Sequence, residues 1–146
     1  MPIKIAVENR GDLRLVVYRY SGLIRQEQVL ESVTRALSGF APNQPYRELL
    51  IFERDSDLSY FDTASLEVVN RECAELYRRL QLGPRTAAAM LDESMDAKII
   101  MPLFNALSLA AGGVDLGFKL FTNVDPALEW LGVPLDEGLK IVNRTA

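Results

Sequence analysis

Residues 49–66 read LLIFERDSDLSYFDTASL, and this stretch decides the fold class. Its first four residues, 49–52, form a continuous apolar run of strand length, which is typical of a strand that is covered on both faces. The polar and acidic segment 53–62 follows and predicts a loop. Asp62 is a favourable N-cap for an amphipathic helix over about residues 63–80. A buried strand followed by such a helix is the repeating unit of an α/β domain.

The alternation of strands and helices continues on both sides of this unit. Residues 3–8 and 13–20 alternate apolar and polar side chains across a short turn that contains Gly11, so they predict a β-hairpin. Pro102 lies inside an apolar helical segment and predicts a kink or a break there. The other predicted elements are helices over residues 25–38, over about 94–110 and from Asp125, and strands over 86–91 and 116–121.

These elements follow one another in the order ββαβαβαβα and predict an α/β fold. The expected architecture is a single domain over residues 1–146, with a mixed β-sheet of about five strands and helices packed mainly on one side. A chain of 146 residues is long enough for one such domain to bury a substantial core. Residues 133–146 have no strong pattern and are predicted to be a weakly structured C-terminal tail.

The composition excludes several kinds of catalysis. The chain has no histidine and a single cysteine, so Ser-His-Asp triads, Cys-His pairs and His-ligated zinc sites are ruled out. Cys73 lies in the apolar stripe of the helix over 63–80 and is predicted to be a buried thiol. The acidic residues of segment 53–62 are interpreted as a solvated loop rather than as a Mg²⁺ or Ca²⁺ site. We therefore expect no enzymatic activity, no cofactor and no metal.

Charge and hydropathy limit the partners. The net charge is −4, and there is no dense run of lysine and arginine, so nucleic acid is not expected as a partner. The longest uncharged stretch, residues 99–114, is shorter than the roughly 20 residues that a membrane-spanning helix needs. Because no segment resembles a signal peptide either, the protein is predicted to be cytoplasmic.

Three segments resemble a known family. Residues 15–22, LVVYRYSG, form a strand that ends in glycine before a helix. Residues 49–66 lead from a strand through an acidic loop to the helix start Asp-Thr-Ala-Ser-Leu, and residues 118–131 join a strand to a helix that ends in Ala-Leu-Glu-Trp-Leu. Together they resemble the STAS domain of the bacterial anti-sigma-factor antagonists, and especially the SpoIIAA-like group, which shares features with the CRAL-TRIO lipid-transfer fold.

The resemblance implies a non-catalytic regulatory module that binds a protein partner. In the family, a partner kinase phosphorylates a serine at the helix start; Thr63 stands at that position, and Ser65 stands where the family has glycine. Asp62, Thr63 and Ser65 are therefore the predicted phosphorylation or partner-contact site. A phosphate there would meet unpaired backbone N–H groups at the positive end of the helix dipole. The alternative is that Asp62 only caps the helix and the other two are ordinary first-turn residues.

The segment 95–111 carries apolar residues all around the predicted helix, whereas surface helices usually keep a polar face. Three interpretations are open: the helix is buried in the core, it forms a homodimer interface, or it is a lid over an apolar cavity, as the CRAL-TRIO resemblance implies. The lid predicts an alternative function, a carrier or sensor of a small apolar ligand bound under this helix. The residues predicted to make the ligand or dimer contact are Ile99, Ile100, Leu103, Phe104 and Leu107.

Overall fold

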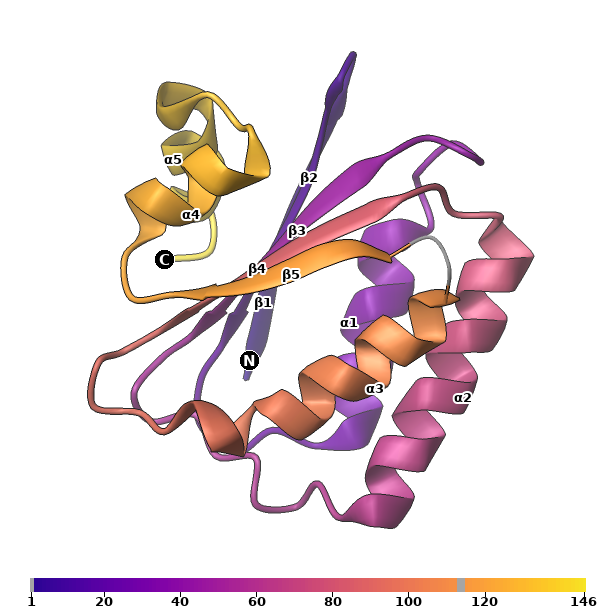
Figure 1. The fold of residues 1–146 in the computed structure, drawn as a ribbon, viewed down its shortest axis with the longest axis vertical. Coiled ribbons are helices and arrows are strands. Elements are labelled where there is room, and N and C mark those ends of the chain that lie inside the picture. Colours follow the sequence, from indigo (N-terminus) through magenta and orange to yellow (C-terminus); the bar gives the residue numbers. More distant parts are fainter. Residues whose placement is uncertain (1, 113–114) are drawn as a thin grey trace.

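The computed structural model describes residues 2–112 and 115–146 and confirms the α/β fold, with a single mixed β-sheet (Figure 1). The described residues form the strands β1 (Ile3–Arg10), β2 (Leu13–Tyr20), β3 (Tyr46–Phe52), β4 (Arg85–Leu91) and β5 (Asp115–Phe121). These strands lie side by side in chain order. β1 pairs antiparallel with β2, whereas the pairs from β2 to β5 are parallel.

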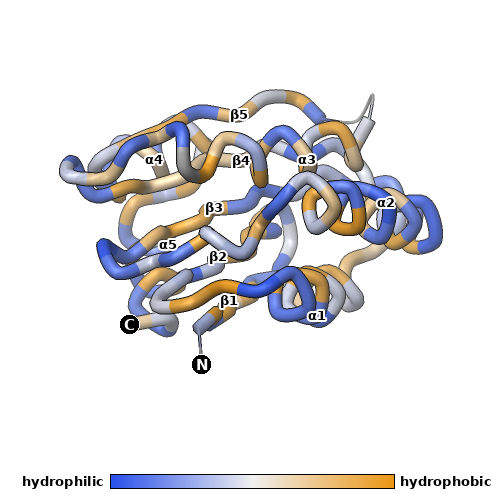
Figure 2. The backbone as a smooth tube through the Cα atoms, turned by 90° about the horizontal axis from the view of Figure 1, so that it is seen from below, coloured by the Kyte–Doolittle hydropathy of each residue, from blue (hydrophilic) through white to orange (hydrophobic). Residues whose placement is uncertain are grey.

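The helices form a layer on each face of the sheet. The longer helices α1 (Gln26–Leu37), α2 (Thr63–Leu80) and α3 (Met101–Ala111) cover one face, and α4 (Val124–Leu131) and α5 (Leu135–Asn143) cover the other (Figure 1). From β2 to β5, each crossover moves the chain one strand further in the same direction. Because such crossovers are right-handed, their helices all fall on one face. Figure 2 shows the sheet between these two helical layers.

The buried core lies on both faces of the sheet, which explains the continuous apolar run at residues 49–52. Leu50 and Phe52 belong to the core under α1, α2 and α3, whereas Leu49 and Ile51 belong to the core under α4 and α5. Each of these four residues is at most 1% exposed. A strand that is covered on both faces needs apolar side chains at every position, and this is the pattern that the sequence displays.

Local signals set the ends of the long helices. α2 spans Thr63–Leu80, the range that the sequence predicted, with Asp62 as its N-cap. The apolar segment around Pro102 is broken in two: a 3-10 turn, η1 (Ala97–Ile99), ends before α3 begins at Met101. Pro102 therefore stands in the first turn of α3, where its missing N–H costs no hydrogen bond. Gly112 ends this helix with a φ of +60°, and its neighbour Gly113 lies outside the described residues.

The prediction of a weakly structured tail over residues 133–146 is wrong, because these residues contain α5. Ile141 and Val142 are buried with Leu15 of β2 in the core on this face of the sheet. Thr145 is also fully buried, and its hydroxyl accepts a hydrogen bond of 3.0 Å from Nε of Arg19. A helix of nine residues is marginal by itself in water, so tertiary packing rather than a local pattern stabilises it.

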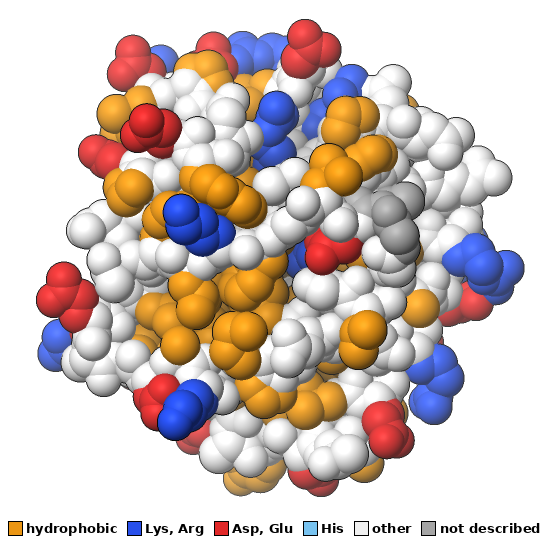
Figure 3. Space-filling view, in the orientation of Figure 1, with side chains coloured by type: hydrophobic (Ala, Val, Ile, Leu, Met, Phe, Trp, Pro, Cys, Tyr) orange, Lys and Arg blue, Asp and Glu red, His pale blue; other side chains and the backbone are white. Residues whose placement is uncertain are grey.

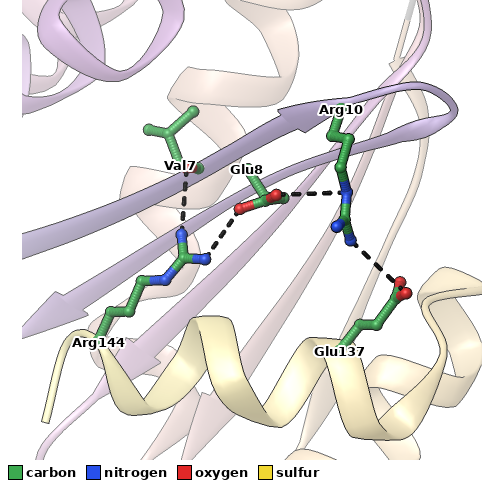
Figure 4. Close-up of polar contacts among 5 residues, drawn as sticks. All are labelled: Val7, Glu8, Arg10, Glu137 and Arg144. Atoms are coloured by element: carbon green, nitrogen blue, oxygen red, sulfur yellow. Dashed lines mark hydrogen bonds and ion pairs between the residues drawn. The ribbon is translucent and has the colours of Figure 1, made fainter.

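Polar contacts attach the same helix to the edge strand β1 (Figure 4). The Arg144 guanidinium donates to the Glu8 carboxylate at 2.9 Å and to the Val7 carbonyl at 3.5 Å. The guanidinium of Arg10 lies between the carboxylates of Glu8 and Glu137, 3.6 Å from each. These side chains place α5 along β1 and cover part of the sheet's edge.

Candidate functional site

The N-terminus of α2 holds the predicted switch residues. Oδ1 of Asp62 accepts a hydrogen bond of 2.8 Å from the backbone N–H of Ser65, which confirms Asp62 as the N-cap. The Ser65 hydroxyl donates to the carbonyl of Tyr60 at 3.4 Å, so it is engaged in holding the loop. Thr63 is exposed. Of the two hydroxyl-bearing residues among the three, Thr63 is therefore the more exposed one.

Hydrogen bonds tie the acidic loop that precedes α2 to the segment after β2. The N–H of Asp57 donates to the Gly22 carbonyl at 2.8 Å, and the N–H of Ile24 donates to the Asp57 carbonyl at 2.9 Å. Leu58 is buried within the loop. Hydrogen bonds from Ser59 lower the pKa of Asp57, so its carboxylate stays charged. These contacts hold the acidic loop in place, and the loop ends directly before Thr63, the first residue of α2.

Replacing Asp62 by alanine is expected to lower the melting temperature by a few degrees, whereas Asp62→Asn keeps an equally good N-cap. Hydrogen bonds from Ser65 lower the pKa of folded Asp62. The contribution of its charge is therefore complete above the unfolded pKa and is lost as the pH falls through the folded pKa. Thermal unfolding between about pH 7 and about pH 3 measures this. A difference in melting temperature between the parent protein and Asp62→Asn that is as large in acid as at neutral pH would contradict this expectation.

Most of the residues predicted to make the ligand or dimer contact lie in the core. Ile100, Leu103, Phe104 and Leu107 are at most 2% exposed, and the side chain of Ile99 lies outside the described residues. A contact with a second copy through those four side chains would need exposure that they do not have. Of the three interpretations of segment 95–111, burial in the core is the one that this packing supports.

The exposed side of α3 forms an apolar groove with α2. The groove has a volume of about 310 Å³, and Leu109, on its rim, is 74% exposed. Nδ2 of Asn70 donates to the Ala106 carbonyl at 3.0 Å and holds the two helices together. The groove-lining residues are Thr63, Leu66, Glu67, Asn70, Pro102, Asn105, Ala106 and Leu109. The two regions singled out in the sequence, the start of α2 and the apolar segment, therefore meet in one place.

A buried charged cluster lies under the helices at the start of β4. Arg85 is 0% exposed and Glu48 is 3% exposed. Nη1 of Arg85 donates to Oδ1 of Asp115 at 2.9 Å, and its Nε and Nη2 lie 3.2 Å and 3.5 Å from the two Glu48 oxygens. One guanidinium therefore faces the carboxyl groups of both Glu48 and Asp115. The sequence patterns did not indicate this cluster, and its one signal was a glutamate directly before the apolar run at residues 49–52.

The groups around this cluster stay protonated. Burial, reinforced by the Glu48 carboxylate, raises the pKa of Tyr18 and of Tyr77 well above the usual value. The same two causes raise the pKa of Cys73 to about 12. The thiol is buried, as predicted. A thiol with so high a pKa is not a thiolate nucleophile at neutral pH.

Comparison with known proteins finds no family model that matches this chain and no curated protein that matches it significantly. The STAS resemblance therefore stays a prediction, and the function is inferred from the fold and the groove. Within the described residues, no helix combines the length and the apolar character that crossing a membrane requires. In the same part of the chain, no three histidine, cysteine or acidic residues gather closely enough to hold a metal ion.

Proposed function

We propose that this chain is a non-catalytic, cytoplasmic protein-binding module whose partner docks in the groove between α2 and α3. The observation that carries the proposal is the composition of that groove. Thr63, the position where the resemblance implies a switch, lines the same apolar hollow as Leu109, although the two are far apart in the sequence. An apolar groove between two helices is the surface that an amphipathic helix of another protein recognises.

The partner's apolar side chains would cover Leu66, Pro102 and Leu109, which line the groove. Leu109 supports this role because a leucine with 74% of its surface in water gains free energy when a partner buries it. The buried face of the same helix anchors it in the core, so the groove is preformed and binding costs little ordering entropy.

A negative charge at Thr63 is expected to oppose binding. Phosphate or glutamate at this position would lie beside Glu67 at the end of the groove, where a partner's apolar side chain would strip water from it. The same charge would change the stability of the fold little, because the favourable interaction with the helix dipole in the first turn of α2 offsets the repulsion by Glu67 one turn along the helix. Thr63 can thus change affinity with little change in stability.

Photo-crosslinking from the groove tests the proposal. A benzophenone amino acid at position 109 is expected to capture a protein partner in the cells that make this chain, whereas the same group at the exposed position of Leu135 is not. Thr63→Glu is expected to reduce the captured fraction roughly five- to tenfold, because a charge at the interface opposes docking. Thr63→Val keeps the shape and should retain capture. Gln44→Glu, which adds the same charge at an exposed position outside the groove, is the matched control.

Three outcomes would contradict the proposal. Equal capture from positions 109 and 135 would show that the groove is not the contact surface. Equal loss of capture in Thr63→Glu and Gln44→Glu would mean that net charge rather than the groove controls binding. If the crosslinker captured only a second copy of this chain, the exposed face of α3 would be a homodimer contact rather than a binding site for a regulatory partner.

A carrier of a small apolar ligand under residues 95–111 is the second candidate. We place it second because Ile100, Leu103, Phe104 and Leu107 belong to the packed core on this face. A ligand there would have to displace these side chains.

A further inference from the structure

Among the described strands, only β4 and β5 are parallel neighbours that send the chain to opposite faces of the sheet. After β4 the chain runs to η1 and α3 on one face, and after β5 it runs to α4 on the other (Figure 1). Two loops that part in this way leave a crevice between the carboxyl ends of their strands. Open α/β sheets bind ligands in such crevices.

A pocket of about 420 Å³ lies at this point. Its size falls in the range of roughly 300–1,000 Å³ that is usual for small-molecule sites. The lining residues come from both diverging loops, and they are Leu91, Asp92, Glu93, Met95, Ala97, Leu120, Phe121, Thr122 and Pro126. Figure 3 shows apolar side chains gathered between β5 and the start of α3. The pocket therefore offers an apolar surface at the place where topology favours ligand binding.

The charged side chains that line the pocket are both acidic. Asp92 and Glu93 supply carboxylates and Thr122 a hydroxyl, and none of the described lining residues is basic. Oδ1 of Asp92 accepts hydrogen bonds from the N–H and the hydroxyl of Ser94, at 2.9 Å and 2.6 Å. These bonds hold the carboxylate in one orientation and lower the pKa of Asp92, so it is charged at neutral pH.

Two basic side chains approach the pocket from outside its lining. Nζ of Lys119 lies 5.5 Å from the centroid of the Phe121 ring, which is part of the lining. Nη2 of Arg54 lies 3.4 Å from both oxygens of Asp92. The Arg54 side chain is 75% exposed, and such a solvent-exposed ion pair is weak and easily exchanged. A cationic ligand would therefore compete with Arg54 for the Asp92 carboxylate.

We propose that this crevice binds a small apolar molecule that carries a protonated amine. The apolar part would lie against Met95, Phe121 and Pro126, and the ammonium group would be held by Asp92 and Glu93. This site lies on other residues than the α2–α3 groove, so it adds a small-molecule ligand to the proposed protein-binding function and does not depend on it.

Three probes with one hydrocarbon and different head groups test the chemistry: 4-phenylbutylammonium, 4-phenylbutanol and 4-phenylbutyrate. Each is titrated into the ¹⁵N-labelled full chain to about 10 mM, because probes of this size bind with Kd values in the millimolar range. The ammonium is expected to bind best and the carboxylate worst. The shifted amide signals should map to residues 91–97 and 120–126. No binding of any probe, equal binding of the carboxylate and the ammonium, or shifts elsewhere would overturn the proposal.

Charge variants separate the site from general electrostatic attraction. The double variant Asp92→Asn, Glu93→Gln is expected to bind the ammonium probe roughly three- to fivefold more weakly and to bind the alcohol with unchanged affinity. Arg54→Gln removes the side chain that competes for Asp92, so it should raise the affinity for the ammonium probe by about two- to threefold. Glu27→Gln, an exposed acid in the first turn of α1, is the control and should change nothing. If Glu27→Gln lowers the affinity for the ammonium probe as much as the pocket variants do, the attraction is not local and the proposal fails.

Discussion

Replacing Arg85 by methionine is expected to lower the free energy of unfolding by about 3–5 kcal/mol, because it leaves Glu48 buried without a positive partner. Methionine keeps much of the side-chain volume, so the loss comes from the charge rather than from a cavity. Glu48 is 3% exposed and cannot regain water without opening the core. Urea denaturation followed by circular dichroism measures the change as a shift in the transition midpoint at an unchanged slope.

The double variant Arg85→Met, Glu48→Met is the matched control. With both charges replaced by apolar side chains, the unpaired buried carboxylate is gone, and most of the lost stability should return. Asp115, which is 17% exposed, can then take its solvation from water. Two results would contradict the destabilising role of an unpaired Glu48. One is a free energy of unfolding of Arg85→Met within about 1 kcal/mol of that of the parent protein. The other is a double variant that is less stable than Arg85→Met alone.

Replacing Phe104 by alanine is expected to lower the free energy of unfolding by about 3–5 kcal/mol, the usual loss when a buried aromatic ring is removed and a cavity remains. Phe104 is 1% exposed, and its ring stacks on that of Phe118 with 3.4 Å between the centroids. Leu109→Ala on the exposed side of the same helix is expected to change stability by less than about 0.5 kcal/mol. Urea denaturation of the two variants therefore separates the core face of α3 from its groove face.

Protein concentration is the control for this pair. If α3 met a second copy through its apolar side chains, the unfolding midpoint of the parent protein would rise with concentration, and Phe104→Ala would abolish the rise. The core interpretation predicts instead a midpoint that is independent of concentration in all three proteins. A concentration-dependent midpoint that is lost in Phe104→Ala would return α3 to the dimer interpretation.

Patterns within a short window predicted the elements on which the fold is built. The bounds of α2 followed from the N-cap Asp62 and a long apolar stripe, because both signals are local and strong. The uninterrupted run at 49–52 correctly indicated a strand with two covered faces. The break at Pro102 followed from the missing N–H of proline. Each of these inferences needed only neighbours along the chain.

The candidate site was predicted in pieces. Thr63 and the apolar segment 95–111 were identified separately, and the structure places them on the two walls of one groove. The inward side of that segment, including Phe104, turned out to be core, whereas Leu109, which was not among the predicted contact residues, is the exposed one. Apolar periodicity could not tell these sides apart, because almost every position of the helix is apolar.

The sequence by itself determined the class of the fold, the order of its strands and α-helices from β1 to α4, and the ends of its longest helix, since spacing, caps and turn residues act over a few residues. Tertiary structure alone decided that α5 folds, that Glu48 and Arg85 pair in the core, and that β4 and β5 part to open a pocket. These features depend on contacts between residues that are distant along the chain. Their stability comes from burial and charge pairing in three dimensions, which a local pattern does not record.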